Sequence, residues 1–311
     1  MKIPKRGANL RRATEEIISI IAAPPRVEKK MIKPVFHLET TELNAENSGN
    51  ANLLMELNEY AFSYLVTSDN HDILAAAYFV LPDRDDLSHA HALREIIYGQ
   101  DMLQHPFRQT ICLYNFSECT LVPDEIYNSD INNDLTDVLF GNLRKNLVLT
   151  EKHHEAVAHT VYRVPSNIHS LVHQKFPNGS YWHLYSLWLK AMKDSASADK
   201  EVIELIFTSD KMLVAVFKEA QLQLLQSVPY STPEDVVYQL LNYCHEFSIS
   251  PEECLVIVSG YIDEDSALFN EMKKYFLKLQ FDQLIGSDQA RLGEYPVHYF
   301  SYLQKIAACV S

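Results

Sequence analysis

Four residues in the later part of the chain could bind a nucleotide. Thr208 and Lys211 lie in the polar break of "ELIFTSDKMLVAVF", where a hydroxyl and an ammonium group could contact phosphate oxygens. Ser259 and Gly260 end the apolar run "CLVIVSG", immediately before a polar stretch. A simpler explanation of Gly260 is that glycine relieves a tight turn from strand to helix. These four residues define the alternative hypothesis for this chain, a divergent ATPase or kinase-like enzyme that binds ATP and Mg²⁺ in a cleft.

A histidine pair gives a weaker indication of metal binding. His169 and His173 are four residues apart, a spacing that on a helix could chelate a metal ion. No glutamate motif lies between them and no third ligand is in obvious register, so we expect no metal ion. The motifs G-x-S-x-G, H-E-x-x-H, P-loop and G-x-G-x-x-G are all absent from the sequence. The sequence therefore names no catalytic residue for the common hydrolases, zinc proteases or dinucleotide enzymes.

A two-metal nuclease would need carboxylates on two neighbouring strands. Glu56 or Glu204 could supply the first carboxylate, but Asn115 and Ser259 stand where the second would be needed.

Residues 1–30 carry eight Lys and Arg and three Asp and Glu, while the remaining 281 residues carry 19 basic and 38 acidic residues. An acidic body repels phosphate backbones, so we expect no nucleic acid on the globular part.

Composition places the chain among globular proteins. Apolar residues make up 47% and charged residues 22% of the 311. No apolar stretch approaches the roughly 20 residues that cross a bilayer, so we expect no membrane span. The five cysteines form no C-x-x-C pair, and Cys112, Cys244 and Cys254 lie in apolar runs as small hydrophobes. These features favour a cytoplasmic location.

The second half has a readable order of elements. Three apolar runs with short polar breaks, 202–209, 212–220 and 222–230, predict an antiparallel meander. Thr232 is a suitable N-cap, Pro233 suits the first helical position, and the apolar stripe that follows has helical spacing. The run at 254–260 is typical of a strand inside a parallel sheet. The stretch 264–281 predicts a closing amphipathic helix.

The first half repeats this order. Runs at 53–57, 61–68 and 73–82 predict three strands, 88–103 predicts a helix with Ser88 as its cap, and 110–116 predicts a fourth strand. The turn at Thr67 matches the turn at Thr208, Ser88 matches Thr232, and the fourth strands match, all at nearly constant spacing. We therefore interpret the chain as an internal duplication.

Two β-β-β-α-β-α units are ribonuclease-H-like, and a pair of them predicts an α/β protein with actin-like, hexokinase-like architecture. We expect residues 1–30 to form a flexible or helical basic arm. Residues 31–195 would be the first actin-like half, with extra strands and helices, and residues 196–311 the second half. Fold alone carries no function.

Several ordered segments resemble a known family. The stretches "TLVPDEIYN", "LLQSVPYSTPEDVVYQLLNY" and "IVSGYIDEDSALFNEMKKYF" resemble a bacterial family described only as domain of unknown function 3822, over roughly residues 50–305. The resemblance implies an actin-like ATPase fold and offers no catalytic residues. It also makes the arm an addition to the family's usual start.

Phosphate-binding turns of active actin-like ATPases need glycine, because backbone amides must approach phosphate oxygens closely. Neither "ELNEYAF" nor "FTSDKML" contains glycine, and the chain has only eight in total. Glu59 would add negative charge where a phosphate would lie, and Lys211 is the single helpful cation. We therefore expect a non-catalytic protein without a cofactor that binds an unknown protein partner.

Overall fold

The computed structural model describes residues 32–40, 43, 47–81, 86–142, 146–153, 157–192, 200–285 and 295–310. The predicted basic arm lies outside the described residues. The predicted boundary between residues 195 and 196 also lies outside them, so the division into two halves stays a prediction.

The first sheet has six strands and contains the predicted meander. This meander consists of β2 (Asn52–Leu57), β3 (Ala61–Thr67) and β4 (Ile73–Val80), in which β3 pairs antiparallel with both β2 and β4. α2 (Asp86–Gly99) then leads to β5 (Gln109–Tyr114), which pairs parallel with β2. Two short edge strands complete the order β1-β4-β3-β2-β5-β9, namely β1 (Phe36–Glu39) and β9 (Ser180–His183).

The second sheet has five strands in the order β12-β11-β10-β13-β14. β10 (Glu201–Phe207), β11 (Lys211–Lys218) and β12 (Gln221–Pro229) form the antiparallel meander. α6 (Pro233–Glu246) connects it to β13 (Leu255–Gly260), which pairs parallel with β10. α7 (Ala267–Met272) then leads to β14 (Lys278–Phe281), parallel to β13.

The two sheets confirm the duplicated ribonuclease-H-like plan and add a strand to it. The order β4-β3-β2-β5-β9 in the first sheet matches β12-β11-β10-β13-β14 in the second. The predicted closing helix at 264–281 is wrong in its second part, because α7 ends at Met272 and the apolar segment after it pairs with β13. Each unit is therefore β-β-β-α-β-α-β.

The landmark that paired Thr67 with Thr208 is also wrong. Thr67 ends β3 and precedes the turn to β4, whereas Thr208 follows β10 in the turn to β11. The true counterpart of the Thr208 turn is the turn between β2 and β3, at 58–60. The sequence Thr-Ser-Asp occurs at 67–69 and at 208–210 because it favours a tight turn. It does not indicate which two strands the turn connects.

Of the two predicted helix caps, only the one in the second half is confirmed. Thr232 caps α6 through a reciprocal capping box with Asp235, as predicted. Ser88 lies inside α2, which begins at Asp86, so its predicted role as the cap is wrong.

Within the described residues, no helix has both the length and the apolar character that crossing a bilayer requires.

An additional unit follows β5 in the first half only. β6 (Cys119–Pro123), α3 (Asn132–Phe140), β7 (Leu147–His153) and β8 (Ala158–Val164) form a small antiparallel sheet with one helix, which we call the insert. The chain then continues into α4 (Ser166–Lys175) and β9. The stretch "NLVLTEKHHEAVAHTVYRVP" contains β7 and β8, and residues 154–156 between them lie outside the described part.

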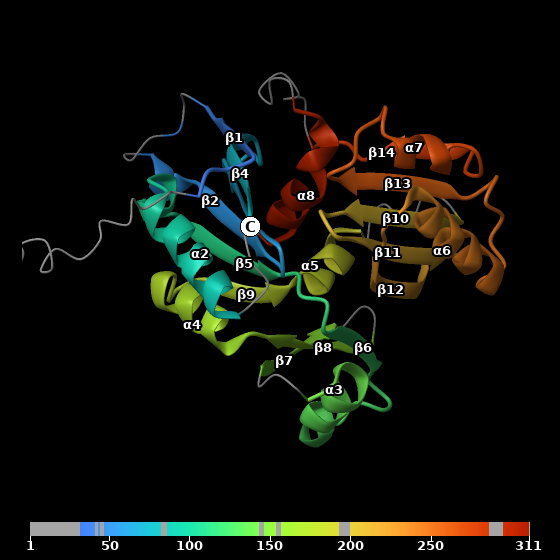
Figure 1. The fold of residues 1–311 in the computed structure, drawn as a ribbon, viewed down its shortest axis with the longest axis horizontal. Coiled ribbons are helices and arrows are strands. Elements are labelled where there is room, and N and C mark those ends of the chain that lie inside the picture. The colour runs from blue at the N-terminus through green and yellow to red at the C-terminus, as the bar shows by residue number, and fades with distance from the viewer. Residues whose placement is uncertain are drawn as a thin grey trace, which may run out of the picture. The chain divides into compact units, whose positions relative to one another are not determined.

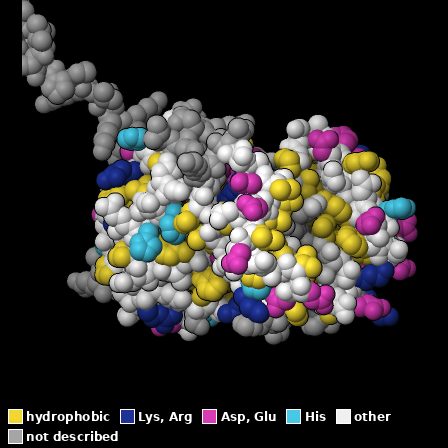
Figure 2. All heavy atoms as spheres, turned by 90° about the horizontal axis from the view of Figure 1, so that it is seen from below, with side chains coloured by type: hydrophobic (Ala, Val, Ile, Leu, Met, Phe, Trp, Pro, Cys, Tyr) yellow, Lys and Arg dark blue, Asp and Glu magenta, His cyan; other side chains and the backbone are white. Residues whose placement is uncertain are grey.

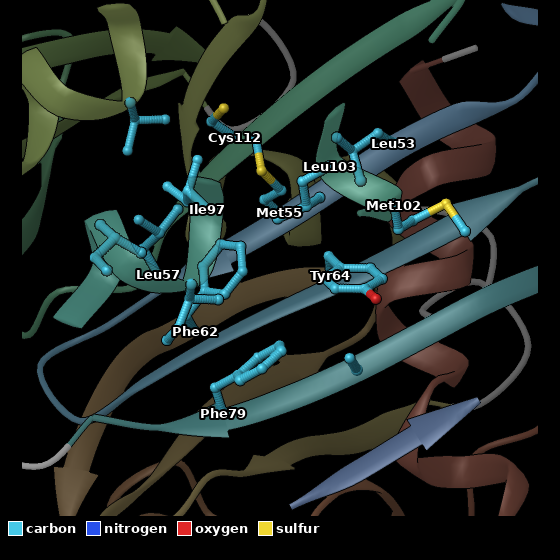
Figure 3. Packing of buried hydrophobic residues seen from close by; sticks show 14 of the residues in the cluster. Leu53, Met55, Leu57, Phe62, Tyr64, Phe79, Ile97, Met102, Leu103 and Cys112 are labelled. Carbon is cyan, nitrogen blue, oxygen red and sulfur yellow. The ribbon is translucent and has the colours of Figure 1, made fainter. Parts of the chain in front are cut away.

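Three buried apolar clusters build the layers. α2 and α4 cover the outer face of the first sheet, and Figure 3 shows Leu57 and Phe62 of that sheet in one cluster with Ile97 of α2. α6 and α7 cover the outer face of the second sheet. The third cluster joins both sheets through α5 (Leu184–Ala191) and α8 (Ser301–Val310), which lie between them (Figure 1).

Candidate functional site

The candidate site lies where the first hairpin of each sheet meets. In the first sheet this hairpin is the turn from β2 to β3, and in the second sheet it is the turn from β10 to β11. Lys211, the first residue of β11, reaches from the second sheet to the first. Figure 1 shows the two sheets side by side, with α8 and α5 between them.

The Lys211 side chain is fully enclosed, with 2% of its surface exposed. Its Nζ donates to the carbonyl oxygen of Asn115 at 2.7 Å, to Ser117 Oγ at 3.0 Å and to Glu59 Oε2 at 3.1 Å. All three acceptors belong to the first half of the chain. An ammonium group has three protons, so these contacts use its full donor capacity. We call this arrangement the Lys211 clasp.

The surroundings of Glu59 favour its charged carboxylate form, opposite in charge to Lys211. Burial would raise its pKa, but the charge of Lys211 and the hydrogen bond from the Ser117 amide outweigh burial and lower the pKa below its ordinary value. The Ser117 amide donates to Glu59 Oε1 at 2.5 Å, so both carboxylate oxygens have partners. The sequence correctly marked Glu59 and Lys211 as opposite charges at this place, and the structure joins them in an ion pair.

Backbone amides of the first turn are already occupied. Asn58 Oδ1 accepts from the amide of Tyr60 at 2.8 Å and from that of Ala61 at 2.7 Å. In a phosphate-binding turn such amides would point at the ligand. Here the Asn58 carboxamide takes the place that a phosphate oxygen would need.

Thr208 closes the second turn with hydrogen bonds from its amide and its hydroxyl. Its amide donates to the carbonyl oxygen of Lys211 at 2.9 Å, and its hydroxyl donates to that same oxygen at 2.9 Å. The hydroxyl also lies 3.2 Å from Asp210 Oδ1. Thr208 is 3% exposed, so its polar groups are used to close the hairpin.

Ser259 and Gly260 lie beside this turn, on the strand next to β10. The Ser259 hydroxyl donates to the carbonyl oxygen of Leu205 at 3.1 Å. Gly260 has φ of +82°, and a Cβ there would lie 2.2 Å from the carbonyl oxygen of Phe207. The close approach of the Phe207 backbone therefore requires glycine at this position.

A second polar group lies deeper between the sheets, at Glu56. This carboxylate accepts from Asn115 Nδ2 at 2.7 Å and from the Tyr302 hydroxyl at 2.6 Å, and it is 4% exposed. Burial raises the pKa of Glu56 above its ordinary value. The two residues weighed for a nuclease therefore do meet, but Tyr302 of α8 covers the carboxylate from the other side.

One small cavity lies beside the predicted residue Ser259. A cavity lined by Ser259, Glu204 and Tyr302 holds about 10 Å³, room for about one water molecule. A hollow of about 640 Å³ lies at the amino ends of β5 and β9, and none of the four predicted residues lines it. The structure thus gathers Thr208, Lys211, Ser259 and Gly260 at one edge of the second sheet, with their polar groups bonded to the protein.

The histidine pair on α4 is engaged by aromatic neighbours. His169 Nδ1 lies 2.8 Å from the Tyr114 hydroxyl, and the His173 ring stacks on Tyr181. Burial, followed by the effect of His173, lowers the pKa of His169. Among the described residues, no three His, Cys, Asp or Glu side chains are grouped as metal ligands would be. Packing explains both rings.

A cysteine and a histidine also meet inside the chain. Cys119 Sγ lies 3.3 Å from His183 Nδ1. Burial raises the pKa of the Cys119 thiol well above its ordinary value and lowers the pKa of His183 to about 3. Both groups are therefore neutral at physiological pH, which is the reverse of what an activated thiolate needs.

Sequence reasoning missed the partners that close the site. Ser117 and Tyr302 were not singled out, and nothing in their local sequence links them to Lys211 or Glu56. Asn58 had a readable signal, because an asparagine directly before a two-residue turn favours bonding to the amides that follow. The contacts of Lys211 span long sequence separations, 152 residues in the case of Glu59.

Comparisons with known proteins agree with the fold. The family model described as "Protein of unknown function (DUF3822)" matches residues 40–279. No curated protein matches the chain.

Two solved structures are similar over most of their length. One is a Bacteroides thetaiotaomicron protein with actin-like ATPase fold and unknown function, 13% identical, with a TM-score of 0.70 over 85% of this chain and 98% of that one. The other is from the PilM–PilN type IV pilus biogenesis complex, 10% identical, with a TM-score of 0.57 over 84% and 98%. The actin-like fold predicted from the element order is confirmed.

Proposed function

The chain belongs to the DUF3822 family, and we propose that it is a protein-binding member of the actin-like ATPase fold that does not hydrolyse ATP. The Lys211 clasp carries this proposal. The first hairpin turns of the two sheets are the places where active members of the fold hold phosphates, and here one turn supplies an ammonium group to the other. The Lys211 ammonium is already bonded to three oxygen atoms of the first half, so a phosphate at this place would have to compete with Glu59 for it.

Displacing the clasp would cost free energy. A triphosphate entering at these turns must remove the ammonium from three oxygen atoms and leave Glu59 facing phosphate charge. Removing one partner from a buried ion pair typically costs about 3–5 kcal/mol. The amides of Tyr60 and Ala61 would have to leave Asn58 as well. The free energy gained by binding the triphosphate would have to offset the loss of these hydrogen bonds and of the ion pair.

The apolar contact between the sheets supports the same proposal. The cluster that joins them includes Leu54 and Leu65 of the first sheet and Val202 and Leu213 of the second. ATPases of this fold need a cleft that admits the nucleotide, whereas here a buried apolar cluster packs α5 and α8 against both sheets. One of the similar solved structures is a complex of two proteins, which accords with a binding role for such a fold.

Calorimetric titration of the full chain with ATP and Mg²⁺ tests the proposal. We expect no heat of binding and no release of phosphate. An active glucokinase treated identically provides the positive control. Micromolar affinity together with turnover would contradict the proposal and support the divergent ATPase or kinase-like enzyme, with Thr208, Lys211, Ser259 and Gly260 at its cleft.

The Lys211→Met variant makes the titration more informative. If the clasp excludes nucleotide, the variant should bind ATP more tightly than the wild type. If Lys211 instead contacts phosphate, the variant should lose any binding that the wild type shows. Circular dichroism of both proteins checks that the variant is folded.

A further inference from the structure

Helix α3 of the insert packs with an unusual face toward its own sheet. The residues that it buries are both polar, Asn132 at 8% exposure and Thr136 at 0%. Of its apolar residues, Val138 and Leu139 are 83% and 51% exposed, while Leu135 and Phe140 are half-buried. Ile131, directly before the helix, is 46% exposed. A surface helix normally turns its apolar stripe inward. Most of the apolar stripe beside α3 is therefore left exposed by the described part of the chain.

The stripe has the spacing of a helix recognition face. Ile131, Leu135, Val138 and Leu139 follow each other at intervals of four, three and one residue, which places them on one side of the helix. Two more exposed apolar residues belong to the insert, Ile126 at 70% and Val157 at 59%. The insert thus exposes five large apolar side chains, more than either sheet with its helices exposes in the described residues.

Specific contacts hold α3 in this orientation. Arg163 of β8 is 4% exposed, and its guanidinium donates to the carbonyl oxygen of Gly141 at 2.6 Å and to the Asp137 carboxylate. Asn132 Nδ2 donates to the Tyr127 hydroxyl at 3.2 Å. Buried polar contacts of this kind define one rotation of the helix, because turning it would take the Asp137 carboxylate away from Arg163.

Acidic residues flank the stripe. Asp130 and Asp134 are exposed, and Asp134 lies three residues after Ile131 and four before Val138. Figure 2 looks at the molecule from below, the side on which α3 lies in Figure 1, and shows apolar and acidic side chains intermingled across the middle of that face. A partner that covers the stripe must bring apolar groups together with positive charge.

We propose that the α3 stripe binds an amphipathic helix of a partner protein, with apolar residues on one face and Lys or Arg beside them. Helix-in-groove and helix-on-helix recognition uses this combination of apolar anchors and a charged rim. A second copy of the chain fits poorly, because α3 carries no Lys or Arg that could pair with Asp130 and Asp134. The inference rests on the proposed protein-binding role and does not depend on the absence of ATP hydrolysis.

The test uses the full chain and a defined probe. The probe is a fluorescent synthetic helical peptide with leucine on one face and lysine on the other, and its matched peptide carries glutamate instead of lysine. Val138→Gln removes the most exposed apolar side chain of the stripe without adding charge. Leu277→Gln is the matched control, because Leu277 is 70% exposed and lies near the second sheet.

We expect fluorescence anisotropy to show binding of the lysine peptide and not of the glutamate peptide. Val138→Gln should weaken binding by about tenfold or more, whereas Leu277→Gln should change it by less than about twofold. Asp134→Asn should reduce the loss of affinity on adding salt. Equal binding by the wild type and Val138→Gln, or no binding by the wild type, overturns the inference.

Two further measurements separate the competing explanations. Sedimentation of the wild type alone should show a monomer, and a dimer that Val138→Gln dissociates would assign the stripe to a second copy and overturn the inference. ATP turnover by a chain whose peptide binding depends on Val138 would remove the proposed non-hydrolysing role and leave this inference standing.

Discussion

The ammonium group of Lys211 lies 2.7 Å from the carbonyl oxygen of Asn115, although the two residues belong to different sheets. Lys211 opens β11 in the second sheet, and Asn115 directly follows β5 in the first. The contact joins the two ribonuclease-H-like units at the place where active members of the fold separate to admit nucleotide. It makes Lys211 a structural link between the sheets.

Replacing Lys211 by methionine should therefore destabilise the fold. Methionine fills similar volume but leaves Glu59 without its cation and Asn115 without a donor. We expect the free energy of unfolding to fall by about 2–4 kcal/mol, measured by urea denaturation.

The matched control is Lys274→Met. Lys274 pairs with Glu271, but its side chain is 62% exposed, and exposed pairs contribute little. An equal loss of stability in the two variants would contradict the structural role of Lys211.

Gly260 and Gly141 allow backbone strain to be separated from steric overlap. Both have positive φ, at +82° and +81°, but a Cβ at Gly260 would meet Phe207 backbone atoms at 2.2 and 2.8 Å, whereas nothing lies within 4 Å at Gly141. Gly141→Ala should cost about 1–2 kcal/mol from strain alone. Gly260→Ala should cost at least about 2 kcal/mol more, because β10 and β13 must move apart. Thermal or urea unfolding of both variants measures the difference, and equal costs would disprove the close contact.

Glu56 and Glu59 should give opposite dependences of stability on pH. Burial raises the pKa of Glu56, so its favourable contribution is present below its ordinary pKa of 4.5 and is lost as pH rises through the raised value. The pKa of Glu59 is lowered, so its contribution is present above 4.5 and is lost as pH falls through the lowered value.

Urea denaturation across the acid-to-neutral range checks these signs. Relative to Glu56→Gln, the wild type should lose stability as pH rises. Relative to Glu59→Gln, the wild type should gain stability as pH rises above the acid range. Difference curves of the same sign would show that the two carboxylates are not held as the structure has them.

The meander strands were predictable because their residues carry a strong local signal. β10 and β11 are runs of apolar residues rich in β-branched types, β12 begins with alternating glutamine and leucine, and α6 has Thr232, Pro233 and a helical stripe. The fifth strands were not predictable. β9 and β14 have only four residues each, and they become strands because β5 and β13 offer them parallel edges.

The four candidate residues were found from their types, but their roles were not. Thr208 and Ser259 could equally bond a ligand or the backbone, and local sequence does not say which. The structure pairs Thr208 with the carbonyl oxygen of Lys211 and Ser259 with that of Leu205. Likewise, α3 has an ordinary amphipathic pattern, and only its contacts with Arg163 show that the apolar side faces outward.

The sequence by itself determined the duplication, the meander strands and the lack of glycine in both phosphate turns, since these depend on residue types and their short-range spacing. Tertiary structure decided that Lys211 bonds to Glu59 and Asn115, that Tyr302 covers Glu56, and that the described residues leave most of the α3 stripe exposed. The physical reason is that hydrogen bonds and burial depend on which side chains meet after the chain has folded, over separations that local patterns do not encode.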